Sequence, residues 1–211
     1  HPSSAATFGE GVDASGSVRA CPLGAVPIRR YGIGDLARFA TLEDFLAKEP
    51  LHVLDVVDDL GFTHEHGAHF AFVPNWGAQT TLNVWNPAVE PNDFSLSQLW
   101  VTGGDGAQTQ TVEAGYLAFP SLYGDSDSRL FIYSTTDNYS RFTTTNCYDL
   151  TCKAFVQLAD SHVLIGGKFD KTSAAGGEQR EFTLRWQFCP RTECKDWEGW
   201  WLRYDGGATS E

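Results

Sequence analysis

A single acidic residue within an apolar stretch is the feature of this sequence best suited to chemistry. Glu113 lies in residues 111–116, Thr-Val-Glu-Ala-Gly-Tyr, whose other members are apolar or uncharged. Burying a carboxyl group in a strand costs free energy unless the group is paired or its pKa changes. The position therefore indicates either a solvent-exposed strand face or a working site.

A neighbouring segment adds further polar chemistry. Residues 94–101, Phe-Ser-Leu-Ser-Gln-Leu-Trp-Val, put Gln98 and Trp100 on one face of a strand, because side chains alternate. By the same alternation Glu113 and Gly115 share a face, and we expect Gly115 to leave open space beside the carboxylate. A carboxylate can take a proton from water, and an amide can polarise a carbonyl group and hold an oxyanion. The set suits peptide hydrolysis if both strands line one concave surface.

A simpler interpretation gives these residues no catalytic role. Gln98 can satisfy a backbone group, and Glu113 can face solvent, because antiparallel sheets often have one polar face. The pattern alone leaves both interpretations open.

The elements expected around these residues are mostly strands. Segments rich in β-branched and aromatic residues, separated by turn signals, predict strands at 80–85, 94–101, 111–116, 130–133, 154–158, 163–165, 182–188 and 200–204. Many short strands without helices between them predict an all-β fold, an antiparallel two-sheet sandwich.

The residues before the strands differ in character. Residues 1–20 are rich in Ser, Gly and Ala and are expected to form a flexible leader. Residues 35–48 have apolar side chains at helical spacing and predict one short helix, which Pro50 ends. Thr41 and Asp44 resemble a capping box that restarts this helix.

Composition limits the classes of function. The chain has 211 residues and a net charge of −12, which argues against nucleic-acid binding, because that depends on Lys and Arg at phosphates. The charge is compatible with work in acid, where protonation relieves self-repulsion. No apolar run reaches the roughly 20 residues that span a bilayer, so no membrane partner is expected. The sequence has neither a signal peptide nor an initiator Met, and we interpret it as a mature or trimmed form.

Cysteine spacing and a glycosylation signal point to secretion. Cys147 and Cys152, like Cys189 and Cys194, are close enough to close small disulfide loops. The alternative is a four-thiolate zinc site, although such sites usually have tighter spacing in intracellular proteins. Cys21 is left over. Residues 138–140, Asn-Tyr-Ser, form an N-glycosylation sequon at Asn138.

Several segments in the same order are similar to the neprosin family of secreted glutamic peptidases. They are 83–87 (NVWNP), 94–101 (FSLSQLWV), 112–116 (VEAGY), 120–125 (PSLYGD), 129–131 (RLF), Cys147-Tyr148 with Cys152, and Trp200-Trp201. The similarity covers about residues 64–204. Residues 21–30 also resemble the end of the activation peptide of that family.

The resemblance implies a bent two-sheet sandwich and a secreted endopeptidase that is made as a zymogen. Such enzymes use two glutamates at acid pH, favour cleavage next to proline and need no cofactor. Glu113 matches the first glutamate. The expected organisation is a leader and activation-peptide-like prosegment at 1–60, followed by a catalytic sandwich at 61–211, with release of the prosegment when carboxylates at their contact are protonated.

Aromatic residues are the candidates for a substrate groove. Trp100, Tyr116, Tyr133 and Trp186 can pack on the pyrrolidine rings of a proline-containing peptide or protein, although aromatic residues of a sandwich more often belong to its core.

The second catalytic glutamate has no convincing match. In the family it lies downstream of the paired tryptophans in a Trp-Gly-Gly-Glu context, whereas Glu178 follows two glycines but precedes the strand at 182–188, and Glu211 is terminal. We therefore expect the C-terminal part of the domain to be missing, and a companion chain to carry the second acid. The alternative function is a non-catalytic extracellular binding module, either lectin-like or a pseudoenzyme.

The histidines are not predicted to bind metal. His64 and His66 would share a strand face, with His69 nearby, but the spacing is not the helical H-E-x-x-H pattern of zinc peptidases. His1 alone does not make a copper site.

Overall fold

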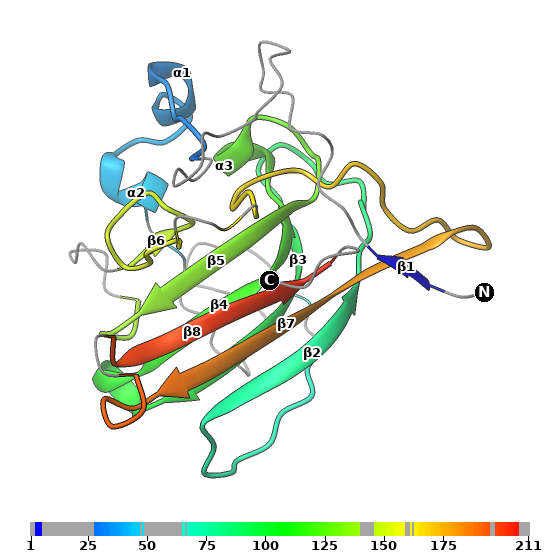
Figure 1. The fold of residues 1–211 in the computed structure, drawn as a ribbon. Helices are drawn as coiled ribbons and strands as arrows, with labels where there is room; N and C mark the ends of the chain where they lie inside the picture. The colour runs from blue at the N-terminus through cyan, green and yellow to red at the C-terminus, as the bar shows by residue number, and fades with distance from the viewer. Residues whose placement is uncertain are drawn as a thin grey trace.

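Two β-sheets packed face to face form the body of the molecule (Figure 1). The computed structural model describes residues 3–5, 28–46, 48, 65, 67–139, 146–158, 161, 163–194 and 197–206. The predicted all-β sandwich is confirmed.

The first sheet carries the segment that contains Glu113. Its strands lie in the order β3-β4-β5-β6, all antiparallel. They are β3 (Ser95–Gly103), β4 (Gln110–Ala118), β5 (Arg129–Thr135) and β6 (Cys147–Tyr148). The register sets Glu113 opposite Trp100 on β3 and Tyr133 on β5.

The second sheet is built around its longest strand. β7 (Gln179–Cys189) pairs antiparallel with β2 (Gly77–Asn83) and β8 (Gly199–Asp205). A short strand, β1 (Ser3–Ala5), pairs with β7 in parallel. The expectation of a flexible leader is therefore wrong for these three residues, which gain backbone hydrogen bonds at the sheet.

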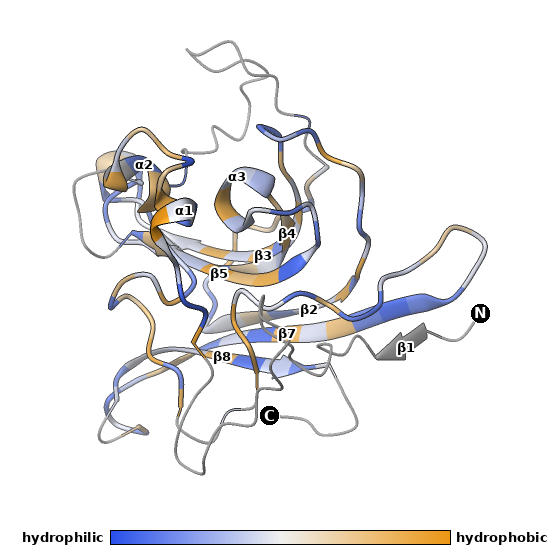
Figure 2. Ribbon diagram, turned by 90° about the horizontal axis from the view of Figure 1, so that it is seen from above, coloured by the Kyte–Doolittle hydropathy of each residue, from blue (hydrophilic) through white to orange (hydrophobic). Residues whose placement is uncertain are grey.

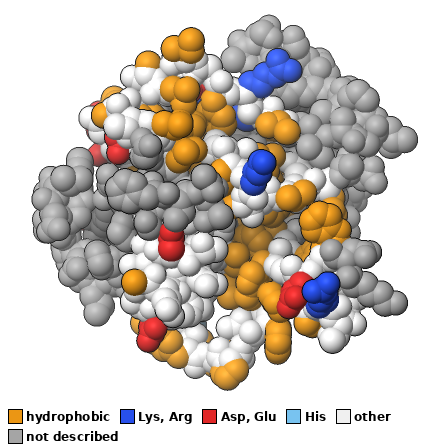
Figure 3. All heavy atoms as spheres, turned by 90° about the vertical axis from the view of Figure 1, so that its left-hand side faces the viewer, with side chains coloured by type: hydrophobic (Ala, Val, Ile, Leu, Met, Phe, Trp, Pro, Cys, Tyr) orange, Lys and Arg blue, Asp and Glu red, His pale blue; other side chains and the backbone are white. Residues whose placement is uncertain are grey.

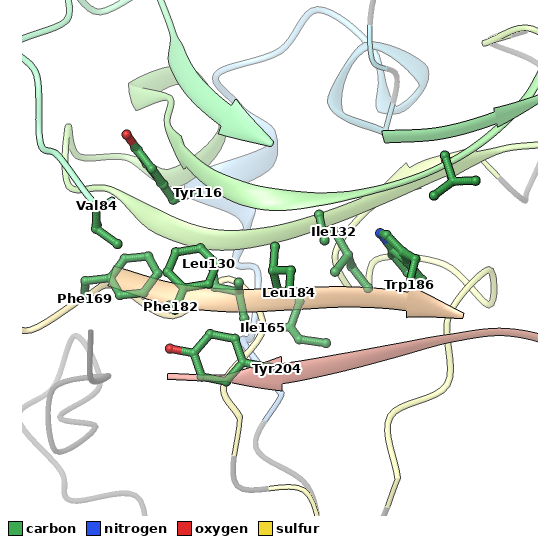
Figure 4. Packing of buried hydrophobic residues seen from close by; sticks show 12 residues of the cluster. Val84, Tyr116, Leu130, Ile132, Ile165, Phe169, Phe182, Leu184, Trp186 and Tyr204 are labelled. Atoms are coloured by element: carbon green, nitrogen blue, oxygen red, sulfur yellow. The ribbon is translucent and has the colours of Figure 1, made fainter. Parts of the chain in front are cut away.

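The space between the sheets holds the main hydrophobic core. Figure 4 shows Tyr116, Leu130 and Ile132 of the first sheet meeting Leu184 and Trp186 of the second. Alternation along a strand explains the assignment, because residues two apart share a face.

A third layer covers the outer face of the first sheet. Figure 2 shows α1 (Ile33–Leu36), α2 (Leu42–Leu46) and α3 (Pro120–Tyr123) on the side of β3, β4 and β5 that faces away from β7. A single-turn 3-10 helix, Gly106–Gln108, joins β3 to β4. This layer makes a second apolar cluster with the sheet, which includes Phe45, Leu117, Leu122, Phe131, Tyr133, Tyr139 and Tyr148.

The single helix predicted at 35–48 is two short helices. Thr41 restarts the helix as predicted, because its Oγ1 accepts the Asp44 backbone N–H at 3.0 Å. The break lets Phe39 and Phe45 pack together, with ring centroids 5.4 Å apart and Phe45 buried. Tertiary packing thus overrides the helical spacing.

Two of the predicted strands are not strands. Residues 154–158 and 163–165 run irregularly beside the core, where Phe155 and Val163 pack against it. The Gln157 side-chain amide donates to the Val163 carbonyl at 2.5 Å. These apolar residues pack against the core without forming strand hydrogen bonds. A prediction from composition cannot distinguish such a buried loop from a buried strand.

The cysteine prediction is confirmed. Cys147 pairs with Cys152 and Cys189 with Cys194, at Cα–Cα distances of 6.0 and 5.9 Å. These pairs replace the zinc alternative, and Cys21 lies outside the described residues.

Gly115 permits a close approach of β3. A Cβ atom at Gly115 would lie 2.0 Å from the Ser97 carbonyl oxygen and 2.6 Å from Gln98 Cα. The expectation of open space beside Glu113 is therefore wrong, since β3 fills it.

We predict that Gly115→Ala destabilises the fold by about 1–3 kcal/mol, because the added methyl group must displace backbone atoms of β3. The measurement is the denaturant midpoint of unfolding. Gly103→Ala in β3 is the matched control, because its Cβ would meet nothing within 4 Å. Equal midpoints for both variants would contradict the close approach.

Candidate active site

Glu113 is fully buried on the outer face of the first sheet, beneath the third layer. Its Oε1 accepts hydrogen bonds from Thr111 Oγ1 at 2.7 Å and from the Tyr139 hydroxyl at 2.6 Å. Its Oε2 forms an ion pair with Lys48 Nζ. Both oxygens of the carboxylate therefore have a hydrogen-bond or ion-pair partner.

Lys48 reaches this carboxylate from the segment that follows α2. Its side chain is 5% exposed, and its Nζ also donates to Gln98 Oε1 at 3.2 Å. The ammonium lies over three aromatic rings, with distances to the centroids of 5.3 Å for Trp100, 5.5 Å for Phe131 and 5.4 Å for Tyr133. These contacts fix the ammonium group in the middle of the outer face.

Burial affects the pKa of the Lys48 ammonium in its pair with Glu113. Desolvation lowers the pKa of the Lys48 ammonium, and the Glu113 carboxylate acts in the opposite direction. Removing one member of such a pair leaves the other charge buried without a partner, which typically costs about 3–5 kcal/mol. The third layer and the sheet are thus coupled through one charge pair.

An unusual turn delivers the hydroxyl of Tyr139. Asn138 and Tyr139 both have left-handed backbone angles, with φ of 55° and 60°. The turn is held by two hydrogen bonds, from the Tyr139 N–H to Thr135 Oγ1 and from the Asn138 N–H to the Thr109 carbonyl, at 2.9 and 2.8 Å. Burial and the nearby Glu113 carboxylate raise the pKa of Tyr139, so its phenol remains a donor.

The structure brings together the oxyanion candidate and two of the residues predicted for a substrate groove. Gln98, Trp100 and Tyr133 lie on the same face as Glu113, on the two neighbouring strands. Tyr116 and Trp186 do not, because they are buried between the sheets (Figure 4). Neither therefore lies beside Glu113: Tyr116 is three residues from Glu113, which puts it on the opposite face of β4, and Trp186 belongs to β7 of the other sheet.

Sequence reasoning missed Lys48 and the role of Tyr139. Thr111 carried a usable signal, because it precedes Glu113 by two residues and so shares its face. Tyr139 appeared only as the middle of the sequon, whose Asn138 is exposed. Lys48 comes from a separate layer, 65 residues before Glu113, and no local pattern marks it.

Among the other candidate residues, Glu178 lies in the part of the chain that the structure describes, and it is not at this site. Glu178 is 55% exposed and pairs with Arg180, in the hairpin that leads into β7. His1, His64, His66 and Glu211 lie outside the described residues. Within the described ranges, no group of three His, Cys, Asp or Glu side chains could hold a metal ion. None of the helices in the described part of the chain is long and apolar enough to cross a membrane.

A cavity lies on the other side of the first sheet from Glu113. A cavity of about 480 Å³ is bounded by residues of both sheets, including Val101, Ile132, Trp186 and Trp200. Figure 3 shows hydrophobic side chains exposed in a hollow on one side of the molecule. Glu113 does not line this cavity, because it points to the other face of β4, where Lys48 fills the space beside its carboxylate.

Comparison with known families decides the relationship. The sequence profile of the Neprosin family matches residues 91–210. The chain belongs to the Neprosin family. The match begins just before β3 and includes Glu113, whereas Lys48 precedes it. Membership in this peptidase-related family indicates a peptidase, which suits the buried carboxylate, hydroxyl donors and amide described above.

This neprosin-family chain has a second buried carboxylate under the same layer. Asp149 Oδ2 accepts hydrogen bonds from the hydroxyls of Tyr123 at 3.0 Å and Tyr31 at 3.4 Å, and Oδ1 accepts the Ile132 N–H at 3.2 Å. The Arg29 guanidinium lies over the rings of Tyr31 and Tyr123, at 5.0 and 4.9 Å. Burial raises the pKa of Asp149 to about 7, and the hydrogen bonds and Arg29 oppose that effect.

We predict that stability gained from Asp149 is lost as pH rises. The pKa of about 7 in the folded state lies above the 3.8 of a free aspartate, so between these values the folded state binds a proton that the unfolded state releases. This contribution is complete below about pH 4 and disappears above about pH 7. In Asp149→Asn the pH-dependent loss should be absent.

The measurement is the melting temperature from pH 4 to 8, with exposed Asp93→Asn as the control. Parallel curves for the wild type and Asp149→Asn would contradict the assignment.

Proposed function

We propose that this protein is a secreted acid glutamic endopeptidase in which Glu113 activates the attacking water. The observation that carries the proposal is the fully buried carboxylate with Oε1 fixed by two hydroxyl donors and with Gln98 beside it. Membership of a peptidase-related family supports the same reaction class.

The proposed chemistry uses each group in a defined way. Glu113 takes a proton from water as the water oxygen attacks the carbonyl carbon of the substrate. The side-chain amide of Gln98 donates to the carbonyl oxygen as negative charge develops there. A second acid then protonates the leaving amine as the C–N bond breaks, which yields a free carboxyl group and a free amine.

The aromatic residues support a preference for proline-containing peptide. Trp100, Phe131 and Tyr133 surround the position that Lys48 Nζ occupies. Flat ring faces pack well against a pyrrolidine ring, so a proline side chain next to the scissile bond suits this surface.

The proposal includes a zymogen in which residues 1–60 act as the prosegment. Lys48 covers the carboxylate that has to reach water. Acid favours release, because protonation of carboxylates at the contact between the prosegment and the sandwich removes their charge interactions. The catalytic domain at 61–211 would then be open to substrate.

We also propose that polypeptide outside this chain supplies the second acid. Among the described residues, the groups that contact the Glu113 carboxylate are Lys48, Thr111 and Tyr139, and none is an acid. Secretion is supported by the two disulfides, which persist in oxidising compartments, and by exposed Asn138 in its sequon.

We predict that Glu113→Gln lowers cleavage of a proline-containing peptide at acid pH by about 100-fold or more, because a general base is lost. The measurement is kcat/KM for the full-length protein after acid treatment. Glu178→Gln is the matched control and should retain activity. Unchanged activity in Glu113→Gln would refute the catalytic assignment, and peptide binding without cleavage by the wild type would favour the extracellular binding module.

We predict that Lys48→Met makes the protein active without prior acid treatment. Methionine keeps much of the side-chain volume but removes the charge that pairs with Glu113, so the prosegment binds less tightly. The fraction of open molecules near neutral pH should rise by about tenfold or more. The measurement is the initial rate of peptide cleavage at pH 6.5–7, an interval chosen to leave carboxylates largely ionised. Lys171→Met, at an exposed position, should behave like the wild type.

A further inference from the structure

We infer that the groups around Lys48 Nζ form a binding site for primary alkylammonium ions, including lysine side chains of other polypeptides. The site consists of one carboxylate, one amide oxygen and three aromatic ring faces. They belong to Glu113, Gln98, Trp100, Phe131 and Tyr133. The inhibitory consequence rests on the proposed peptidase function, whereas binding itself does not.

The site is built by the sheet and not by the segment that carries Lys48. Gln98 and Trp100 come from β3, Glu113 from β4, and Phe131 and Tyr133 from β5. These are adjacent strands in fixed register, and hydroxyl donors on Oε1 hold the carboxylate independently of Lys48. The arrangement is therefore expected to persist when the lysine side chain is removed.

The contacts match the chemistry of a primary ammonium group. Nζ carries three N–H donors, of which Glu113 Oε2 and Gln98 Oε1 accept two. The ring faces attract the positive charge through their quadrupoles, an effect that strengthens when the cation is desolvated. A guanidinium has five donors in a planar fork and would leave more of them unpaired in this space.

Occupation of this site by lysine should be unproductive. The ammonium neutralises the carboxylate that the proposed mechanism uses as a base, and it accepts no proton itself. A polypeptide that inserts lysine here is thus an inhibitor and not a substrate. Lys48 is the lysine of this chain itself that occupies the site.

The test restores the missing atoms of a truncated side chain. Lys48→Ala removes three methylene groups and the ammonium, and n-propylammonium supplies the same atoms. We expect n-propylammonium chloride to raise the melting temperature of the full-length Lys48→Ala protein by about 4 °C or more over equal sodium chloride. 1-Propanol, which lacks the charge, should give a much smaller rise.

The wild type and a double variant are the controls that show whether the amine binds at the site vacated by Lys48. The wild type should show no rise, because Lys48 occupies the site, and the double variant Lys48→Ala/Glu113→Gln should show none, because the carboxylate is absent. Equal rises in the double variant, or with 1-propanol, would overturn the inference. If Lys48→Ala does not fold unaided, the readout is the yield of folded protein on dilution from denaturant, which n-propylammonium should increase and 1-propanol should not.

The thermal readout needs no catalytic activity. A failure of the Glu113→Gln activity test would therefore remove the proposed peptidase function and leave the ammonium site standing. Absence of any amine effect would remove the site and leave the peptidase function standing.

Discussion

A buried carboxylate has to be paired or protonated, and in this chain Glu113 is paired with Lys48 from a different layer of the molecule. That contact helps to hold residues 28–46 and Lys48 over the outer face of the first sheet, where they also cover Phe131 and Tyr133. It also explains why β4 is buried on both faces, since one face packs against the second sheet and the other against this cover. The charge pair therefore links the candidate site to the arrangement of the layers.

The two faces of the first sheet have different roles: one packs in the core, and the other carries the candidate site. Tyr116 and Leu184 belong to the core between the sheets, whereas Glu113, Gln98 and Tyr139 belong to the outer face. The cavity between the sheets lies on the core side and does not reach the Glu113 carboxylate. Changes at the outer face can thus alter chemistry while the core that holds the sandwich together stays packed.

The covering layer contacts two buried acids in different ways. At Asp149, the effect of burial outweighs that of the hydrogen bonds and Arg29 and raises the pKa to about 7, so mild acid neutralises this carboxyl group. At Glu113, an ion pair with Lys48 offsets the burial of both charges. In the proposed proform, the two acids therefore hold the layer by different means, an ion pair at Glu113 and hydrogen bonds from the Tyr31 and Tyr123 hydroxyls at Asp149.

The sequence by itself determined the all-β class, the disulfide pairs, most strands and the face that Gln98 shares with Trp100, because strand alternation and short cysteine loops are local properties. It did not separate Tyr116 and Trp186, which lie between the sheets, from Trp100 and Tyr133 on the outer face, and it assigned strands to residues 154–158 and 163–165, because an apolar side chain does not reveal which core it enters. It gave no sign that Lys48 and Tyr139 contact Glu113, or that Asp149 is buried beneath the same layer. Only the tertiary structure decided these, since the free energy of a buried charge depends on groups that are distant in sequence and close in space.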